Sequence, residues 1–204
     1  MDIDAQKDIL RKSVYDAIYN DGFSNRPNGD YGKIPDFKGS VIAAELLRTT
    51  FQWKTAQTIF SSPDTAQKPV RYFPLEDGKD LIMASPNLQH GYLFLKSSKI
   101  TSFVEASTKD GAFKFSEDLN IEDYPKVDMV VEGSVAVDKK GNRIGKGKGF
   151  GDREIQDLLN RKLIDNNTPI VTTIHPLQLV DSVINDQHDK VLNMIVTTDK
   201  IIRI

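Results

Sequence analysis

The chain has 204 residues, a formal net charge of −2 and no cysteine. This length suits one sizeable domain, and the near-neutral charge argues against a general nucleic-acid-binding protein. The absence of cysteine excludes disulfides, thiolate nucleophiles and cysteine-ligated metals. The sequence begins without a signal-peptide pattern and holds no apolar run long enough for a membrane span. We therefore expect a cytoplasmic protein folded as a single domain over residues 1–204.

The N-terminal part of the chain is predicted to be mainly helical. Ile3–Asn20 has apolar residues at helical spacing, and Gly22 follows as a stop signal. Residues 24–37 contain several prolines and glycines and are expected to form a long loop. Residues 39–50 show a second helical pattern. Short apolar runs bounded by Pro, Gly or Asp then predict strands at 55–60, 70–73 and 81–84.

Residues 85–125 give no clear pattern, whereas the C-terminal part alternates strands with a helix. Residues 127–131 and 134–137 are predicted strands, followed by a turn at 138–142 and a helix at 153–163. The last two strands are predicted at 169–174 and 191–197. Alternating strands and helices indicate an α/β protein with a largely parallel sheet.

The most informative segment covers residues 145–152, where glycines alternate with Lys146 and Lys148 and Asp152 leads into the predicted helix. Glycine lets the backbone approach phosphate oxygens, and the N–H groups at a helix start attract anions. Lysine adds positive charge, and a carboxylate can hold the magnesium that accompanies ATP. The spacing matches neither a Walker A loop nor G-x-G-x-x-G, so an ordinary solvated loop is the alternative on spacing alone.

Residues 141–152, with the sequence GNRIGKGKGFGD, resemble the signature of the 5-formyltetrahydrofolate cyclo-ligase family. In that family an Asn/Asp-Arg-Leu-Gly-x-Gly-x-Gly-Tyr-Tyr-Asp run wraps the phosphates of ATP. Residues 127–138 resemble the strand, glycine and aspartate segment before this loop, and residues 187–197 resemble the C-terminal motif and last strand. Lys7 and Arg11, four residues apart, resemble the N-terminal Lys-x-x-x-Arg pair of the family.

The resemblance is clear over residues 127–199 and weaker but ordered over residues 5–60. It implies a three-layer α/β/α, Rossmann-like fold. It also implies an ATP- and Mg²⁺-dependent ligase that converts a reduced folate, 5-formyltetrahydrofolate, into 5,10-methenyltetrahydrofolate. Such phosphoryl transfer needs alignment and neutralised phosphate charge more than covalent participation by the protein.

The resemblance further implies roles for individual residues. Lys148 and Arg143 would act in catalysis, and Asp152 and Asp189 would bind magnesium. The nucleotide would contact Lys7, Arg11, Arg143, Ile144, Gly145, Lys146, Gly147, Lys148, Gly149, Phe150 and Gly151.

Each of these roles has a plainer alternative. Without the resemblance, Lys7 and Arg11 would be an ordinary solvated face of a helix. Asp152 would be a helix N-cap, a role it can combine with metal binding, and Asp189 would be a turn residue before a strand. Two further aspartates are interpreted as structural: Asp128 beside a strand and Asp138 in a turn.

Two departures from the family pattern concern the substrate. Gly151 stands where the family has its second tyrosine, and residues 59–64 lack the glutamate that helps to recognise folate, with Asp64 as the available carboxylate. Residues 63–71 resemble a divergent branch that keeps the nucleotide-binding parts and alters the folate-binding parts. The alternative function is therefore a nucleotide-binding protein that acts on another small molecule, with little or no folate activity. A non-catalytic RNA-binding module is disfavoured by the overall charge.

Overall fold

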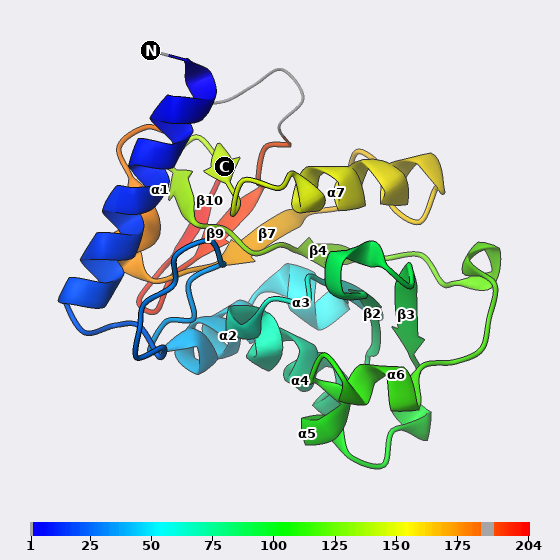
Figure 1. Cartoon of the computed structure of the whole chain (residues 1–204). Helices are drawn as coiled ribbons and strands as arrows, with labels where there is room; N and C mark the ends of the chain where they lie inside the picture. Colours follow the sequence, from blue (N-terminus) through cyan, green and yellow to red (C-terminus); the bar gives the residue numbers. More distant parts are fainter. Residues whose placement is uncertain (1, 185–189) are drawn as a thin grey trace.

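The computed structural model describes residues 2–184 and 190–204, and its centre is a seven-stranded sheet (Figure 1). The strand order is β10-β9-β7-β4-β1-β2-β3, with parallel pairing throughout the interior and antiparallel strands β10 and β3 at the two edges. The strands are β1 (Thr58–Ser61), β2 (Asp80–Ala84), β3 (Tyr92–Leu95), β4 (Met129–Val131), β7 (Ile170–Thr173), β9 (Met194–Val196) and β10 (Ile201–Arg203). The predicted α/β class with a largely parallel sheet is confirmed.

A smaller three-stranded sheet has the order β6-β5-β8 and consists of β5 (Ala136–Asp138), β6 (Arg143–Ile144) and β8 (Leu179–Val180). The α-helices are α1 (Ile3–Asn20), α2 (Ser40–Arg48), α3 (Phe51–Thr55), α4 (Lys68–Glu76), α5 (Phe103–Ala106), α6 (Gly111–Phe115) and α7 (Phe150–Asn160). Short 3-10 turns lie at Thr65–Gln67, Pro86–Leu88, Ser97–Lys99, Ile121–Asp123 and Pro176–Gln178. No helix in the described ranges combines the length and apolar character needed to cross a bilayer.

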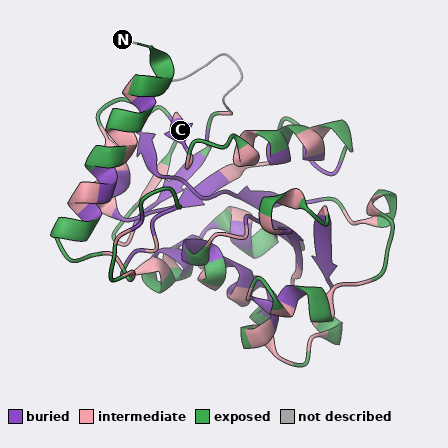
Figure 2. Ribbon diagram, viewed as in Figure 1, coloured by how far each residue is buried: buried purple, intermediate pink, exposed green. Residues whose placement is uncertain are grey.

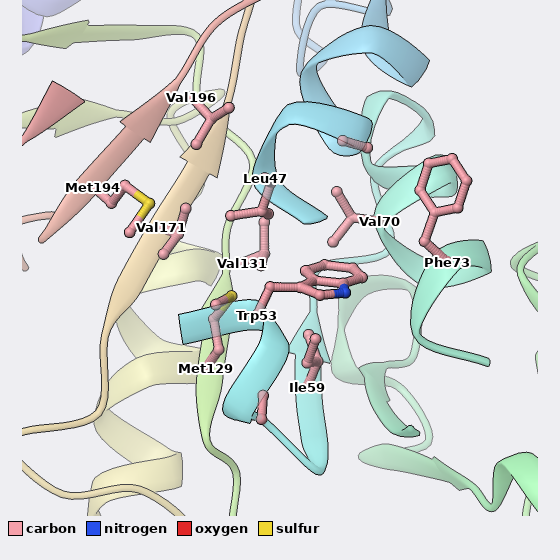
Figure 3. Packing of buried hydrophobic residues seen from close by; sticks show 12 residues of the cluster. Leu47, Trp53, Ile59, Val70, Phe73, Met129, Val131, Val171, Met194 and Val196 are labelled. Carbon is pink, nitrogen blue, oxygen red and sulfur yellow. The ribbon is translucent and has the colours of Figure 1, made fainter. Parts of the chain in front are cut away.

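Helices cover both faces of the large sheet, which makes three layers (Figures 1 and 2). On one face, residues of α2, α3 and α4 such as Leu47 and Trp53 pack against Ile59 and Val131 (Figure 3). On the other face, Ile155 of α7 packs against strand residues whose side chains point away from the first face, such as Val130. The inner strands are thus buried on both sides, which explains their nearly continuous apolar sequences. Helix α1 packs on the small sheet instead.

One strand prediction was wrong, and several elements were missed. Residues 70–73 belong to α4, because Pro69 occupies the first turn of that helix and the apolar side chains face α2 and the sheet. A run of four apolar residues does not distinguish a buried strand from a buried helix. Helix α7 begins at Phe150, earlier than expected, so Gly149 and not Asp152 is its N-cap. Strand β3 and helices α5 and α6 lie in the region without a clear pattern.

A buried arginine fixes the loop that follows β1. Arg71 of α4 is 1 % exposed, and its guanidinium donates hydrogen bonds to the carbonyl oxygens of Ser62, Asp64 and Ser107 at 2.8, 2.9 and 2.9 Å. Burial lowers the pKa of Arg71 to about 10, and the carboxylate of Asp64 partly opposes that shift. The side chain therefore connects the end of β1 to the end of α5.

Replacing Arg71 by methionine is expected to lower the free energy of unfolding by about 2–4 kcal/mol, because the buried carbonyls it satisfies would lose their donor. The matched control is Arg161→Met, which removes an exposed ion pair between the C-cap of α7 and Asp157 and should cost less than about 1 kcal/mol. Urea unfolding of the two variants measures the difference. Equal losses would show that Arg71 contributes no more than a surface charge.

Candidate functional site

A cavity of about 220 Å³ opens at the carboxyl ends of β1 and β4. In the large sheet, β2 and β4 lie on opposite sides of β1, and the chain continues from β1 to β2. The switch point of the sheet therefore lies between β1 and β4. Open α/β sheets bind ligands at this place. The wall consists of Asp4, Lys7, Arg11, Ile34, Ser62, Pro63, Asp64, Asn87, Glu132, Gly133, Arg143, Ile144, Gly145, Lys146, Gly147, Lys148, Gly149, Phe150, Gly151, Asp152 and Glu154.

The glycine–lysine loop between β6 and α7 bends around the first helix. Gly147 and Gly149 have φ of 90° and 62°, which residues with side chains rarely adopt. The Nε of Arg11 donates to the carbonyl oxygen of Gly145 at 2.8 Å, and a Cβ on Gly147 would lie 3.4 Å from Cζ of Arg11. The positive φ therefore favours glycine at both positions, whereas a Cβ on Gly147 would make only an ordinary contact with the Arg11 side chain.

The structure brings together nearly all of the residues predicted for the site. Every predicted nucleotide-binding residue lines the cavity, and so does Asp152. Lys7 and Arg11 reach it from α1, although they are distant in sequence from the loop. Asp189 lies outside the described residues, so its predicted role in magnesium binding stays a prediction. Asp128 and Asp138 lie elsewhere and bind backbone N–H groups, Asp128 at the start of β1 and Asp138 in the turn after β5.

Most cationic groups of the site have carboxylate partners. Arg143 pairs with Asp152 at 2.9 Å, and Lys146 approaches Asp64 at 3.4 Å. Asp152 also accepts a hydrogen bond from the backbone N–H of Lys190 at 3.2 Å. A polyanionic ligand would compete with these carboxylates for the cations, and a divalent cation would give the carboxylates a new partner.

The donor set fits a magnesium ion that arrives with a phosphate ligand. Within the described ranges, no group of three or more His, Cys, Asp or Glu side chains is placed to hold a metal ion. Mg²⁺ is usually bound through one or two protein carboxylates, with phosphate oxygens and water completing the octahedron. Asp152, one of the two predicted magnesium ligands, lines the cavity and supplies a carboxylate of this kind, and Asp64 is a further carboxylate of the wall.

Two glutamates at the base of the cavity were missed by sequence reasoning. Glu132 follows β4 and is 2 % exposed, and Glu154 lies in the first turns of α7 and is 3 % exposed. Burial raises the pKa of Glu154 to about 7 and that of Glu132 well above its ordinary value. Two features of the sequence could have indicated these residues: Glu132 extends an apolar strand, and Glu154 lies on the apolar side of a helix, next to Ile155.

The space beside Gly151 is occupied by charged groups of the protein. A Cβ at this position would lie 2.6 Å from Nη2 of Arg143 and 3.1 Å from Oε2 of Glu132. Phe150 is the one aromatic residue among the described residues of the wall, and the guanidinium of Arg153 covers its ring at 4.7 Å. The cavity therefore provides charge and hydrogen bonds but little aromatic surface.

Comparison with known proteins decides the family. The model of the 5-formyltetrahydrofolate cyclo-ligase family matches residues 24–198. The chain belongs to this cyclo-ligase family. The fold agrees, because the 5,10-methenyltetrahydrofolate synthetase of Aquifex aeolicus superposes with a TM-score of 0.62 at 20 % identity, covering 97 % of this chain and 92 % of that one. The synthetase of Mycoplasma pneumoniae gives a TM-score of 0.55 at 14 % identity, covering 93 % and 97 %.

Relatives of this cyclo-ligase family member carry a longer chain. The methenyltetrahydrofolate synthase domain-containing protein of Bos taurus is 33 % identical, and the match covers 96 % of this chain and 53 % of that protein. The protein of the same name from Danio rerio is 31 % identical, covering 95 % and 52 %. The chain thus spans about half the length of these relatives, and the predicted resemblance to this family and its divergent branch is confirmed.

Replacing Gly151 by alanine is expected to have two opposing effects on the stability of this cyclo-ligase family member. Alanine favours a helix over glycine by up to about 1 kcal/mol, which alone would stabilise α7. The contact with Arg143 and Glu132 should outweigh this gain, so we expect a net loss of about 1–3 kcal/mol in thermal or urea unfolding. Gly145→Ala is the control, because its Cβ would meet nothing closer than Nη1 of Arg143 at 3.8 Å. A stabilised Gly151→Ala variant would show that the space beside residue 151 is open.

Proposed function

We propose that this chain binds Mg²⁺–ATP in the cavity and acts as an ATP-dependent cyclo-ligase that forms 5,10-methenyltetrahydrofolate from 5-formyltetrahydrofolate. One observation carries the proposal: Lys7 and Arg11 of α1 meet the glycine–lysine loop at the switch point of the sheet, directly before α7. Membership of the cyclo-ligase family supports the reaction class. We also propose that the protein is cytoplasmic, as its sequence leads us to expect.

The loop and helix α7 provide what a polyphosphate needs. Helix α7 is 11 residues long, and its N-cap Gly149 supplies no side-chain hydrogen bond to the first turn. The first N–H groups of such a helix attract an anion, and the helix dipole adds to that attraction. Lys146 and Lys148 add positive charge from the loop, and Lys7 and Arg11 add it from α1.

The proposed catalytic contribution is alignment and neutralisation of charge. Lys148 and Arg143 would stabilise the phosphoryl group during transfer, and Asp152 with Asp189 would hold the magnesium ion. Phosphoryl transfer of this kind requires no nucleophile from the protein. Removing one such phosphate contact should raise the barrier by about 2–4 kcal/mol.

A second candidate acceptor is supported by the composition of the wall. Arg143 and Glu132 occupy the space beside Gly151, and Phe150 is covered by Arg153. A pterin ring gains affinity from stacking on an aromatic ring, which this wall supplies poorly. The alternative is therefore a cyclo-ligase-like protein that binds nucleotide and acts on a different small molecule.

Nucleotide binding is testable through stability. Millimolar Mg²⁺–ATP is expected to raise the melting temperature, because a ligand that binds only the native state stabilises it by mass action. Lys148→Ala should weaken the affinity about 10- to 100-fold, as expected for loss of a charged contact to phosphate. Lys140→Ala, in the exposed turn between β5 and β6, is the matched control and should behave like the wild type. The absence of any shift in the wild-type protein would refute the nucleotide site.

Whether 5-formyltetrahydrofolate is the substrate can be tested by mixing it with the protein and Mg²⁺–ATP and measuring the absorbance of methenyltetrahydrofolate as it forms. We expect weak turnover with a high Michaelis constant, because the wall near Gly151 offers little stacking surface. Rapid turnover with a Michaelis constant in the low micromolar range would show that other residues hold the pterin well. No turnover, together with intact nucleotide binding, would favour the alternative acceptor.

A further inference from the structure

The long loop between α1 and α2 is closed on itself and reaches the cavity. Its two ends meet in an isolated antiparallel bridge between Ser24 and Phe37, and the N–H of Lys38 donates to the carbonyl oxygen of Phe23 at 2.7 Å. Compact surface loops whose ends meet in this way frequently belong to functional sites. This loop places Ile34, which is 5 % exposed, in the wall of the cavity.

A buried carboxylate holds the inside of this loop together. Asp30 is 1 % exposed, and its carboxylate accepts hydrogen bonds from the hydroxyl of Ser24 at 2.7 Å and from the backbone N–H of Asp36 at 2.9 Å. The guanidinium of Arg26 donates to the same carboxylate and forms an ion pair with it. A buried charge requires such partners, so the ion pair gives Arg26 a fixed place in the loop.

The same guanidinium supports two segments of the cavity wall from behind. Its Nη1 donates to the carbonyl oxygen of Ile34 at 3.1 Å, and its Nη2 donates to the hydroxyl of Thr65 at 3.1 Å. Thr65 directly follows Asp64, which lines the cavity. Arg26 itself is not one of the described residues that form the wall. It therefore connects two wall segments without facing the space that a ligand would occupy.

The two wall segments meet over Gly133, shortly after β4. A Cβ on Gly133 would lie 2.6 Å from Oδ2 of Asp64 and 3.1 Å from Cγ1 of Ile34. The other carboxylate oxygen of Asp64 lies 3.4 Å from Nζ of Lys146 in the glycine–lysine loop. A chain of contacts thus leads from the guanidinium behind the wall to a lysine that is proposed to bind phosphate.

We propose that Arg26 is a positioning residue of the cavity: it fixes the wall formed by Ile34 and Asp64, so that Lys146 is held where the phosphates bind. The proposal rests on the nucleotide site proposed above. Binding an anion costs less when the cation that meets it is already oriented. A displacement of about 1 Å at a supporting residue can weaken a site strongly, although that residue touches no ligand.

The test is calorimetric titration with Mg²⁺–ADP, at a temperature far below the melting point of each variant. Arg26→Met should weaken the affinity about 10- to 100-fold, because both wall segments lose their common donor. Arg26→Lys should weaken it less, because lysine keeps the charge beside Asp30 but lacks the planar fork that reaches both segments. Arg48→Met is the matched control, since its partly exposed ion pair with Asp77 lies outside the wall, and it should bind like the wild type.

Thr65→Val keeps the test valid if Arg26→Met does not fold. It removes only the hydroxyl that accepts from Arg26, and it should weaken binding of Mg²⁺–ADP about two- to tenfold. Thr55→Val is its control and should match the wild type, because that hydroxyl donates to the carbonyl oxygen of Phe51 within α3 at 3.0 Å.

A purely structural role of Arg26 would lower the melting temperature of its variants and leave the affinity of the folded protein unchanged. Wild-type affinity in both Arg26→Lys and Thr65→Val would therefore overturn the positioning role and leave the proposed function intact. Failure of the wild-type protein to bind Mg²⁺–ADP at all would overturn both.

Discussion

The buried guanidinium of Arg143 is the group on which the site depends. It is 3 % exposed, so its charge must be met by the protein. It donates to Asp152 of α7 at 2.9 Å and approaches the carbonyl oxygen of Gly133 after β4 at 3.5 Å. Loss of one partner from a buried ion pair typically costs about 3–5 kcal/mol. Arg143 therefore joins the large sheet, the small sheet and α7 around the cavity, and its guanidinium occupies the space that a side chain at residue 151 would need.

The same arrangement explains how a cavity with many basic groups exists in a chain with a net charge of −2. Asp64 and Asp152 hold Lys146 and Arg143 in place without a ligand. The positive groups are thereby oriented in advance, which reduces the ordering cost of binding an anion. The carboxylates also reduce the positive potential of the cavity.

Sequence reasoning succeeded where a signal was local and strong. The periodic pattern gave the bounds Ile3–Asn20 for α1, and β-branched runs located β4, β7 and β9. The loop glycines predicted the cavity wall, because their spacing before a helix reflects a backbone requirement. The run at 70–73 failed, because only its neighbours in space determine whether such a short segment is helical.

The buried glutamates were beyond the reach of sequence reasoning for a related reason. A single glutamate after a strand, or on a helix, is common on protein surfaces. Its meaning changes only when the fold buries Glu132 and Glu154 in the wall of the cavity. The same holds for Gly151, because the sequence shows that a side chain is missing there but not that Arg143 fills the space.

The bond between Arg11 and the carbonyl oxygen of Gly145 joins positions 134 residues apart in the chain. During synthesis α1 is made before its partner loop, and strands β1, β2, β3 and β4 of the large sheet are made between them. Closing so long a loop costs entropy that early local contacts cannot repay. The contact between α1 and the loop therefore forms only after the residues between them have been made. A growing chain therefore lacks this cavity until the glycine–lysine loop and the start of α7 have been made.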